Sequence, residues 1–135
     1  MKKLHIIALL AFSASASAAT VQVKIDGVTS ARGVVQVAVC DEANYRKDCT
    51  LTATVPARAG FVMVDVPNVP AGTWAVLAYH DENSNKKLDT NFVVMPKEGY
   101  GFSNGAASRF GPPSFKDAAI PVGDGIVPAL VTLKY

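Results

Sequence analysis

The chain has 135 residues, of which 50% are hydrophobic and 18% charged, and its formal net charge is +2. This length suits one compact domain with a single hydrophobic core. The sequence lacks the clusters of Lys and Arg that a nucleic-acid-binding surface or a membrane-surface protein needs, so we expect neither kind of partner.

Residues 1–18 have the pattern of a cleaved signal peptide. Lys2 and Lys3 precede an apolar stretch at residues 4–12, and residues 16–18 fit the A-x-A rule for signal peptidase. The apolar stretch is too short to cross a bilayer about 30 Å thick as a helix. We therefore predict a periplasmic or secreted protein, whose mature chain, residues 19–135, has no membrane span and forms one β-sandwich domain.

Cys40 and Cys49 are the two cysteines of the chain. An even number of cysteines at short separation in an exported protein predicts a disulfide. In the chain-entropy account, closing a loop of this length stabilises the fold by about 2.5–3 kcal/mol. The alternative is a catalytic thiol, and the presence of a second cysteine available for pairing argues against it.

Apolar and polar residues alternate along most of the chain with a period of two, which is typical of half-buried β-strands. We predict seven strands, at residues 21–25, 34–39, 50–55, 60–66, 73–80, 118–122 and 126–135. The third and fourth strands are expected to pair with each other, and so are the sixth and seventh. In the fourth strand, the side that carries Val62, Val64 and Val66 is predicted to be buried.

Short strands separated by turns, with no amphipathic helix, predict an all-β fold, an antiparallel β-sandwich of about seven strands. Residues 96–116 interrupt this pattern with one long loop rich in Gly, Pro and aromatic residues. Such a loop in a compact domain is usually either functional or an ordered cap over the core. Its rings form either a surface that stacks on a sugar or peptide, or a plug at the end of the sandwich, and we favour the plug.

The most specific motif is a polar loop after the fifth predicted strand. Oxygen-bearing side chains fall at Asp81, Asn83, Asn85 and Asp89, and position 7 of the loop would offer the carbonyl oxygen of Lys87. This is the 1-3-5-9 spacing with which a tight loop surrounds calcium, an ion that prefers six to eight oxygen ligands. The spacing therefore predicts a calcium site.

Two positions depart from such a calcium loop. Position 6, usually glycine, is Lys86, and position 12, usually a bidentate glutamate, is Phe92. The alternative is a polar hairpin in which Asp and Asn side chains form Asx-turns. Both interpretations stay open, and a calcium affinity here would be weak, about 10⁻⁴–10⁻³ M.

Two further patterns raise the question of catalysis. Residues 101–105 match the G-x-S-x-G motif of α/β-hydrolases, but that motif needs a following helix and a later histidine. We interpret the match as a coincidence, because the histidine of the mature chain, His80, comes earlier. His80 next to Asp81 also allows a small hydrolase or lyase that uses His80 with Asp81 or Glu98. The competing interpretation is a hydrogen-bonded, structural histidine.

A candidate ligand surface combines the end of the fifth predicted strand with the Gly/aromatic loop. Its residues are His80, Glu98, Tyr100, Phe102, Ser103 and Asn104. The partner that we expect for it is a protein, a peptide or a glycan.

Several runs together resemble a bacterial family of secreted proteins, the one known as domain of unknown function 2141. They are residues 70–76 (PAGTWAV), 80–83 (HDEN), 88–89 (LD), 96–104 (PKEGYGFSN) and 112–115 (PPSF). Residues 70–76 also resemble the start of a strand in prealbumin-like and collagen-adhesin B-type sandwiches. The resemblance implies an exported β-sandwich, immunoglobulin-like or prealbumin-like, and brings no activity with it. The family commonly has glycine where this chain has Lys86.

These observations favour a secreted, non-enzymatic binding or structural module, stabilised by calcium if the polar loop binds it. Two alternatives stay open. One is the small periplasmic hydrolase or lyase that uses His80. The other is an adhesive or assembly module that pairs through an exposed strand edge.

Overall fold

The computed structural model describes residues 18–85, 98–107 and 111–135. Within these ranges the chain is all-β, as predicted, and has one short helix. The elements are β1 (Ala18–Val28), β2 (Val34–Cys40), β3 (Leu51–Pro56), β4 (Gly60–Pro70), β5 (Gly72–Asp81), β6 (Tyr100–Phe102), α1 (Phe115–Ala118), β7 (Ala119–Val122) and β8 (Ile126–Thr132). The predicted signal peptide lies outside the described residues, except for residue 18, where β1 begins.

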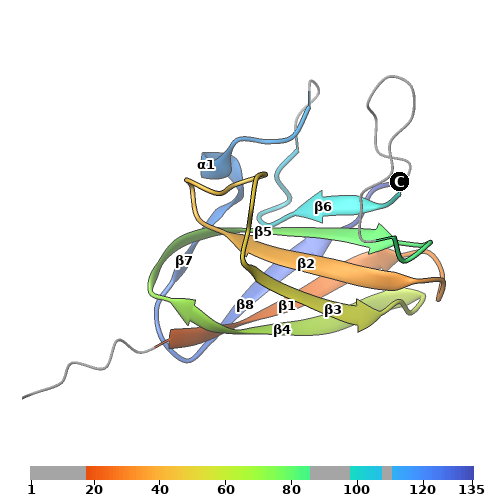
Figure 1. Ribbon diagram of the computed structural model, residues 1–135, viewed down its shortest axis with the longest axis horizontal. Helices are drawn as coiled ribbons and strands as arrows, with labels where there is room; N and C mark the ends of the chain where they lie inside the picture. Colours follow the sequence, from red (N-terminus) through yellow and green to blue (C-terminus); the bar gives the residue numbers. More distant parts are fainter. Residues whose placement is uncertain (1–17, 86–97, 108–110) are drawn as a thin grey trace, which may run out of the picture.

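The strands form two sheets (Figure 1). One sheet has the order β4-β1-β8, and the other has the order β3-β2-β5-β6, with β7 also paired to β5. The pairings between these strands are antiparallel except for that of β1 with β8, which is parallel. The prediction of an antiparallel sandwich is therefore right for all but one neighbouring pair.

The core lies between the two sheets and consists mostly of valine. Successive side chains of a strand point to opposite faces of the sheet, so every second residue is buried along residues 19–25 of β1, 35–39 of β2 and 62–66 of β4. In β4 the buried side is the predicted one, with Val62, Val64 and Val66 inside. Each buried valine stabilises the fold by roughly 1.5–3 kcal/mol relative to an exposed one, so this repeating pattern holds the two sheets together.

Both predicted pairings of consecutive strands are wrong. β3 pairs with β2 and β4 pairs with β1, so residues 57–59 lead from one sheet to the other. In the same way β7 pairs with β5 and β8 with β1, and residues 123–125 also lead from sheet to sheet. Alternation shows which side of a strand is buried. It does not show the neighbour of a strand, because both sheets offer the same apolar inner face.

The described part of the Gly/aromatic loop contains regular secondary structure that was not expected from the sequence. It contributes β6 and also α1, whose first turn is capped by the Ser114 hydroxyl, which accepts a hydrogen bond from the Asp117 N–H at 3.3 Å. At Gly101, a Cβ atom would lie 2.4 Å from the carbonyl oxygen of Thr132, so glycine is what allows β6 to approach the end of β8. None of the described helical residues forms a segment long and apolar enough to cross a membrane.

Candidate functional site

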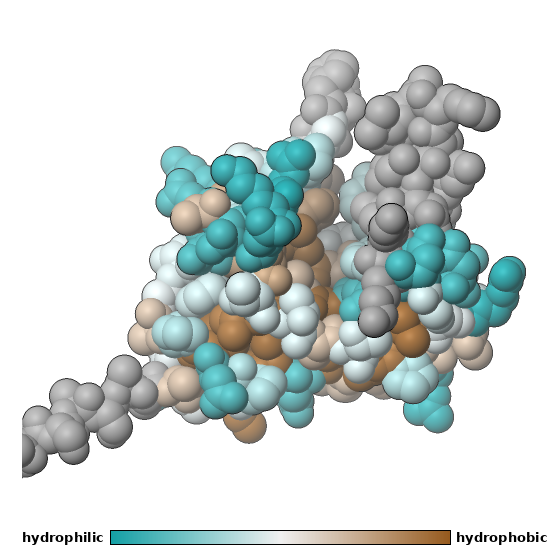
Figure 2. All heavy atoms as spheres, in the orientation of Figure 1, coloured by the Kyte–Doolittle hydropathy of each residue, from teal (hydrophilic) through white to brown (hydrophobic). Residues whose placement is uncertain are grey.

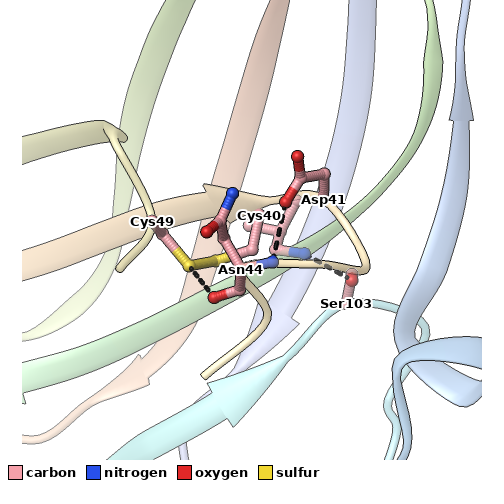
Figure 3. The surroundings of a disulfide bond; sticks show 6 residues. Cys40, Asp41, Asn44, Cys49 and Ser103 are labelled. Atoms are coloured by element: carbon pink, nitrogen blue, oxygen red, sulfur yellow. Dashed lines mark hydrogen bonds between the residues drawn. A yellow bond between two sulfur atoms is a disulfide. The ribbon is translucent and has the colours of Figure 1, made fainter. Parts of the chain in front are cut away.

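Cys40 and Cys49 form a disulfide, as predicted (Figure 3). Their Cα atoms are 5.1 Å apart, a usual separation for a disulfide. The bond closes residues 41–48 onto the end of β2, and inside this loop the Asp41 carboxylate accepts a hydrogen bond from the Asn44 N–H at 2.9 Å. Because both cysteines are bonded, neither is a free thiol that could act as a nucleophile.

His80 is buried at the end of β5, and both of its ring nitrogens are hydrogen-bonded. Nε2 lies 2.6 Å from the carbonyl oxygen of Arg32, which can only accept, so Nε2 carries the proton. Nδ1 lies 2.8 Å from the Tyr135 hydroxyl oxygen, which accepts a hydrogen bond from the Thr29 N–H at 3.2 Å. His80 thus joins β5 to the β1–β2 connection and to residue 135.

The two carboxylates predicted to assist His80, those of Asp81 and Glu98, accept hydrogen bonds from backbone N–H groups, whereas Oε1 of Glu82 lies 3.8 Å from Nδ1 of His80. Oδ1 of Asp81 accepts a hydrogen bond from the Asn85 N–H at 3.1 Å, and Oε2 of Glu98 accepts one from the Glu82 N–H at 2.6 Å. Both residues are buried, like His80 itself. A buried ring with both nitrogens engaged cannot reach a substrate without rearrangement, so the geometry favours the structural interpretation of His80 over the hydrolase or lyase.

The predicted calcium ligands lie only partly within the described residues. Asp81 and Asn83 each direct a side-chain oxygen at the Asn85 N–H, at 3.1 and 3.2 Å. This is an Asx-type turn, and it also brings two of the predicted ligand oxygens together. Lys87 and Asp89 lie outside the described residues, and in the ranges that are described no three His, Cys, Asp or Glu residues could hold a metal. The calcium site stays a prediction, which a chelator-reversible rise in melting temperature would support.

Ser103 and Asn104 bind the backbone of neighbouring elements. The buried Ser103 hydroxyl, labelled in Figure 3, accepts a hydrogen bond from the Val76 N–H at 3.0 Å. The same hydroxyl donates a hydrogen bond to the carbonyl of Ala118. The Asn104 amide donates a hydrogen bond to the carbonyl of Ala119 at 2.8 Å. Ser103 is therefore a structural residue between β6, β5 and α1, and not the exposed nucleophile of a G-x-S-x-G motif.

The aromatic residues at this end of the sandwich pack on one another. Phe102 is buried, and Tyr45 and Tyr100 meet its ring edge-on with centroids 6.5 and 6.1 Å away. Tyr45 also contacts Phe115 at 5.7 Å, and its hydroxyl donates a hydrogen bond to the carbonyl of Pro113 at 2.8 Å. Burial raises the pKa of Tyr45. This packing is what we expect of a plug that covers the core.

Tyr100 and Phe102 also line a hollow of about 250 Å³, together with Thr132 and Lys134 of the last strand region. The structure thus brings two residues of the predicted ligand surface to one concave site. The other four residues have hydrogen-bonded, structural positions: His80, Glu98, Ser103 and Asn104.

A different surface, on the outer face of the three-stranded sheet, carries exposed apolar side chains. Phe61 and Met63 of β4 are 52% and 45% exposed, and Leu130 of β8 is 52% exposed. The register places Lys24 of β1 between Met63 and Leu130 in one row across the sheet. Nζ of Lys24 lies 4.9 Å from the centroid of the Phe61 ring. Apolar side chains on a solvent-facing sheet are a common mark of an interaction surface.

β4 also ends its sheet. In the order β4-β1-β8, no strand among the described residues pairs with the second side of β4. A hollow of about 770 Å³ lies at this position, lined by residues 55–63, which run from the end of β3 into β4. β3 is the end strand of the other sheet, so this side of the sandwich is an open seam. In Figure 2, apolar residues reach the surface among polar ones where β3 and β4 lie.

The opposite seam is protected. Isolated bridges join Tyr100 to Lys134 and Ser103 to Val131, so β6 contacts the end of β8. Along the rest of this seam, β7 contains Pro121 and the solvent side of β8 contains Pro128. Proline cannot donate to a strand ladder and commonly protects sheet edges.

By contrast, residues 60–66 of β4 contain no proline and one charged residue, Asp65. Sequence reasoning placed Phe61 and Met63 on the exposed side of this strand without giving them a function. The available signal was the presence of large apolar residues on the solvent side of an alternating strand.

Comparison with known proteins identifies a family. No curated protein and no solved structure matches the chain significantly. The profile of one bacterial family, described as "Uncharacterized protein conserved in bacteria (DUF2141)", matches residues 23–128. These residues run from the middle of β1 into β8 and contain all the runs on which the predicted resemblance rests. The chain therefore belongs to this family.

Proposed function

We propose that this protein is an exported, non-enzymatic interaction module that binds a strand of a protein partner along the free edge of β4. The observation that carries the proposal is the unprotected edge itself, residues 60–66, with Phe61 and Met63 about half exposed. Adding a strand satisfies the free backbone N–H and C=O groups of an edge. An open, apolar edge otherwise invites aggregation, so natural proteins usually block it.

The surroundings of the edge suit an added strand. The hollow of about 770 Å³ beside β4 gives room for the side chains of an incoming strand that point toward the seam. On the outer face, Phe61 and Met63 offer apolar contacts to its alternate side chains. Backbone pairing then supplies affinity, and these side chains supply specificity.

The strand order argues against an immunoglobulin-like sandwich and leaves the prealbumin-like one as the proposed scaffold. In an immunoglobulin constant domain the first and second strands lie side by side in one sheet. Here β1 lies between β4 and β8, while β2 lies in the other sheet. This order leaves β3 and β4 as the two end strands of the open seam.

Site-specific photo-crosslinking in bacteria that export the protein tests the proposed function. A photoreactive amino acid at Met63 should give a covalent protein adduct, because this side chain lies on the edge strand. The same amino acid at Leu130 is the matched control, since Leu130 is similarly exposed on the same face but lies on the protected β8.

A second variant distinguishes strand pairing at the edge from non-specific hydrophobic association. Lysine on an edge strand discourages pairing, and Phe61→Lys replaces a half-exposed residue, so the fold should persist. With the photoreactive amino acid at Asp65, the adduct should be lost in the Phe61→Lys background. Absence of an adduct from Met63, or equal yields from Met63 and Leu130, would rule out the β4 edge as the binding site.

A further inference from the structure

We infer that the strand added to β4 is β4 of a second copy of this chain, paired antiparallel about a two-fold axis at Met63. This inference rests on the proposed function of the β4 edge. A two-fold dimer buries the same patch of both subunits, so the patch must be complementary to itself. β4 meets this requirement in its backbone register, its apolar contacts and its charges.

The register follows from the length of the unprotected segment. The proline-free residues 60–66 are centred on Met63, and Pro67 follows them directly. Pairing the whole segment with its copy places Met63 opposite Met63, and Phe61 opposite Asp65. A shift by two residues toward Pro67 would bring a proline opposite Phe61 and shorten the ladder, because proline has no N–H to donate.

The alternation of β4 sets the orientation of the second copy. A pair of residues directly opposite each other in an antiparallel ladder points to the same face. With Met63 opposite Met63, the valine sides of both copies face their own cores, and the exposed sides form one continuous outer face. A register shifted by one residue would turn the whole second copy over, so that its core lay on the other side of the joined sheet and the two exposed sides no longer formed one face.

Charge complementarity selects a second copy over an arbitrary apolar strand. Within one copy, Nζ of Lys24 lies 4.9 Å from the centroid of the Phe61 ring and 3.8 Å from the carboxylate of Asp26. The proposed register places Asp65 of the second copy directly across from Phe61. The Asp65 carboxylate of one copy therefore lies near the Phe61 ring and the Lys24 ammonium group of the other copy. The two-fold axis produces this pair of opposite charges twice in the dimer.

Cysteine trapping tests the register in purified protein whose Cys40–Cys49 disulfide has formed. Met63→Cys should give a disulfide-linked dimer under mild oxidation, because the two copies of residue 63 are opposite each other. Phe61→Cys is the matched control, with similar exposure on the same strand. Its two copies would be about 13 Å apart along the strands, beyond the limit of about 7 Å between Cα atoms of a disulfide.

Mixed samples complete the test. Phe61→Cys mixed with Asp65→Cys should give a linked dimer, whereas each variant alone should not. Equal dimer yields from Met63→Cys and Phe61→Cys would indicate random collision and overturn the register. A Met63→Cys protein that stays monomeric while photo-crosslinking at Met63 still captures another protein would overturn the second copy as partner and leave the proposed function standing.

Charge reversal provides an independent readout that does not involve the strand backbone. Lys24→Glu and Asp65→Lys each place like charges across the interface, so each should lower the association constant roughly 3–10-fold, two exposed pairs being affected in each dimer. The double variant Lys24→Glu with Asp65→Lys restores opposite charges and should recover the association measured by sedimentation equilibrium. Failure of the double variant to recover it, with both single variants weakened, would contradict the proposed pairing of Lys24 with Asp65.

Discussion

Gly33 lies where two backbone segments come so close together that only glycine fits without a clash. Gly33 has a φ of +69°, and a Cβ atom there would lie 2.0 Å from the carbonyl oxygen of Asp81. The backbone of the β1–β2 connection therefore lies directly against the end of β5. The same contact region holds His80 in place through the carbonyl of Arg32.

The close backbone contact at Gly33 leads to a quantitative prediction with a matched control. Gly125 has the same φ of +69°, but its Cβ position is in open space. Gly125→Ala should cost only the left-handed backbone conformation, about 1–2 kcal/mol of unfolding free energy. Gly33→Ala adds a clash with backbone atoms and should cost clearly more. Urea unfolding measures both, and equal losses would argue against the close contact at Gly33.

The role of a single residue could be predicted from the sequence where its side chain has one common role in such a protein. Two cysteines in a chain that is predicted to be exported point to a disulfide, and Cys40 and Cys49 form one. His80 was harder, because an exposed catalytic histidine and a buried hydrogen-bonded one look the same in a sequence. Its partners Arg32 and Tyr135 are 48 and 55 residues away along the chain, so only the fold brings them together.

At the scale of elements, alternation predicts strands better than it predicts their neighbours. The valine sides of β1, β2 and β4 were recognisable because a period of two has one meaning in a strand. The pairing partners of β3 and β7 could not be recognised, because a short turn can lead either to the next strand of the same sheet or across to the other sheet. β6 was missed since its three residues are too few to show a period.

The plug at the end of the sandwich leads to a prediction about alkaline pH. Burial raises the pKa of Tyr45, an effect that Arg46 opposes and Asp117 reinforces. A raised pKa in the folded state means that folding favours the neutral phenol, which also donates a hydrogen bond to Pro113. This stabilisation is complete below the ordinary tyrosine pKa of about 10 and is lost as the pH rises through the raised value.

Tyr45→Phe removes the ionisable group and nearly keeps the ring packing. The unfolding free energy of the wild type should therefore fall more steeply above about pH 10 than that of Tyr45→Phe. Chemical denaturation at a series of alkaline pH values measures the difference. Parallel pH profiles for the two proteins would show that the phenol of Tyr45 is no less able to ionise in the folded state.

At the scale of the whole molecule, one seam of the sandwich is protected and the other is open. One is bridged by β6 and carries Pro121 and Pro128, while the other has β3 and β4 as open end strands. This asymmetry could not be predicted from the sequence. The strand order decides which strands lie at the edges of a sheet, and the sequence does not give that order. The apolar, exposed side of β4 was readable, but its meaning depends on the open edge next to it.

The most direct test of the central claim is amide hydrogen exchange of the purified protein at low and high concentration. A ladder between two copies of β4 protects backbone N–H groups of residues 60–66, so their exchange should slow as the concentration rises. The N–H groups of residues 126, 127, 129 and 130 in β8 should exchange at the same rate at both concentrations, because that edge is protected by Pro128. Exchange in β4 that does not depend on concentration would contradict pairing of this edge with a second copy.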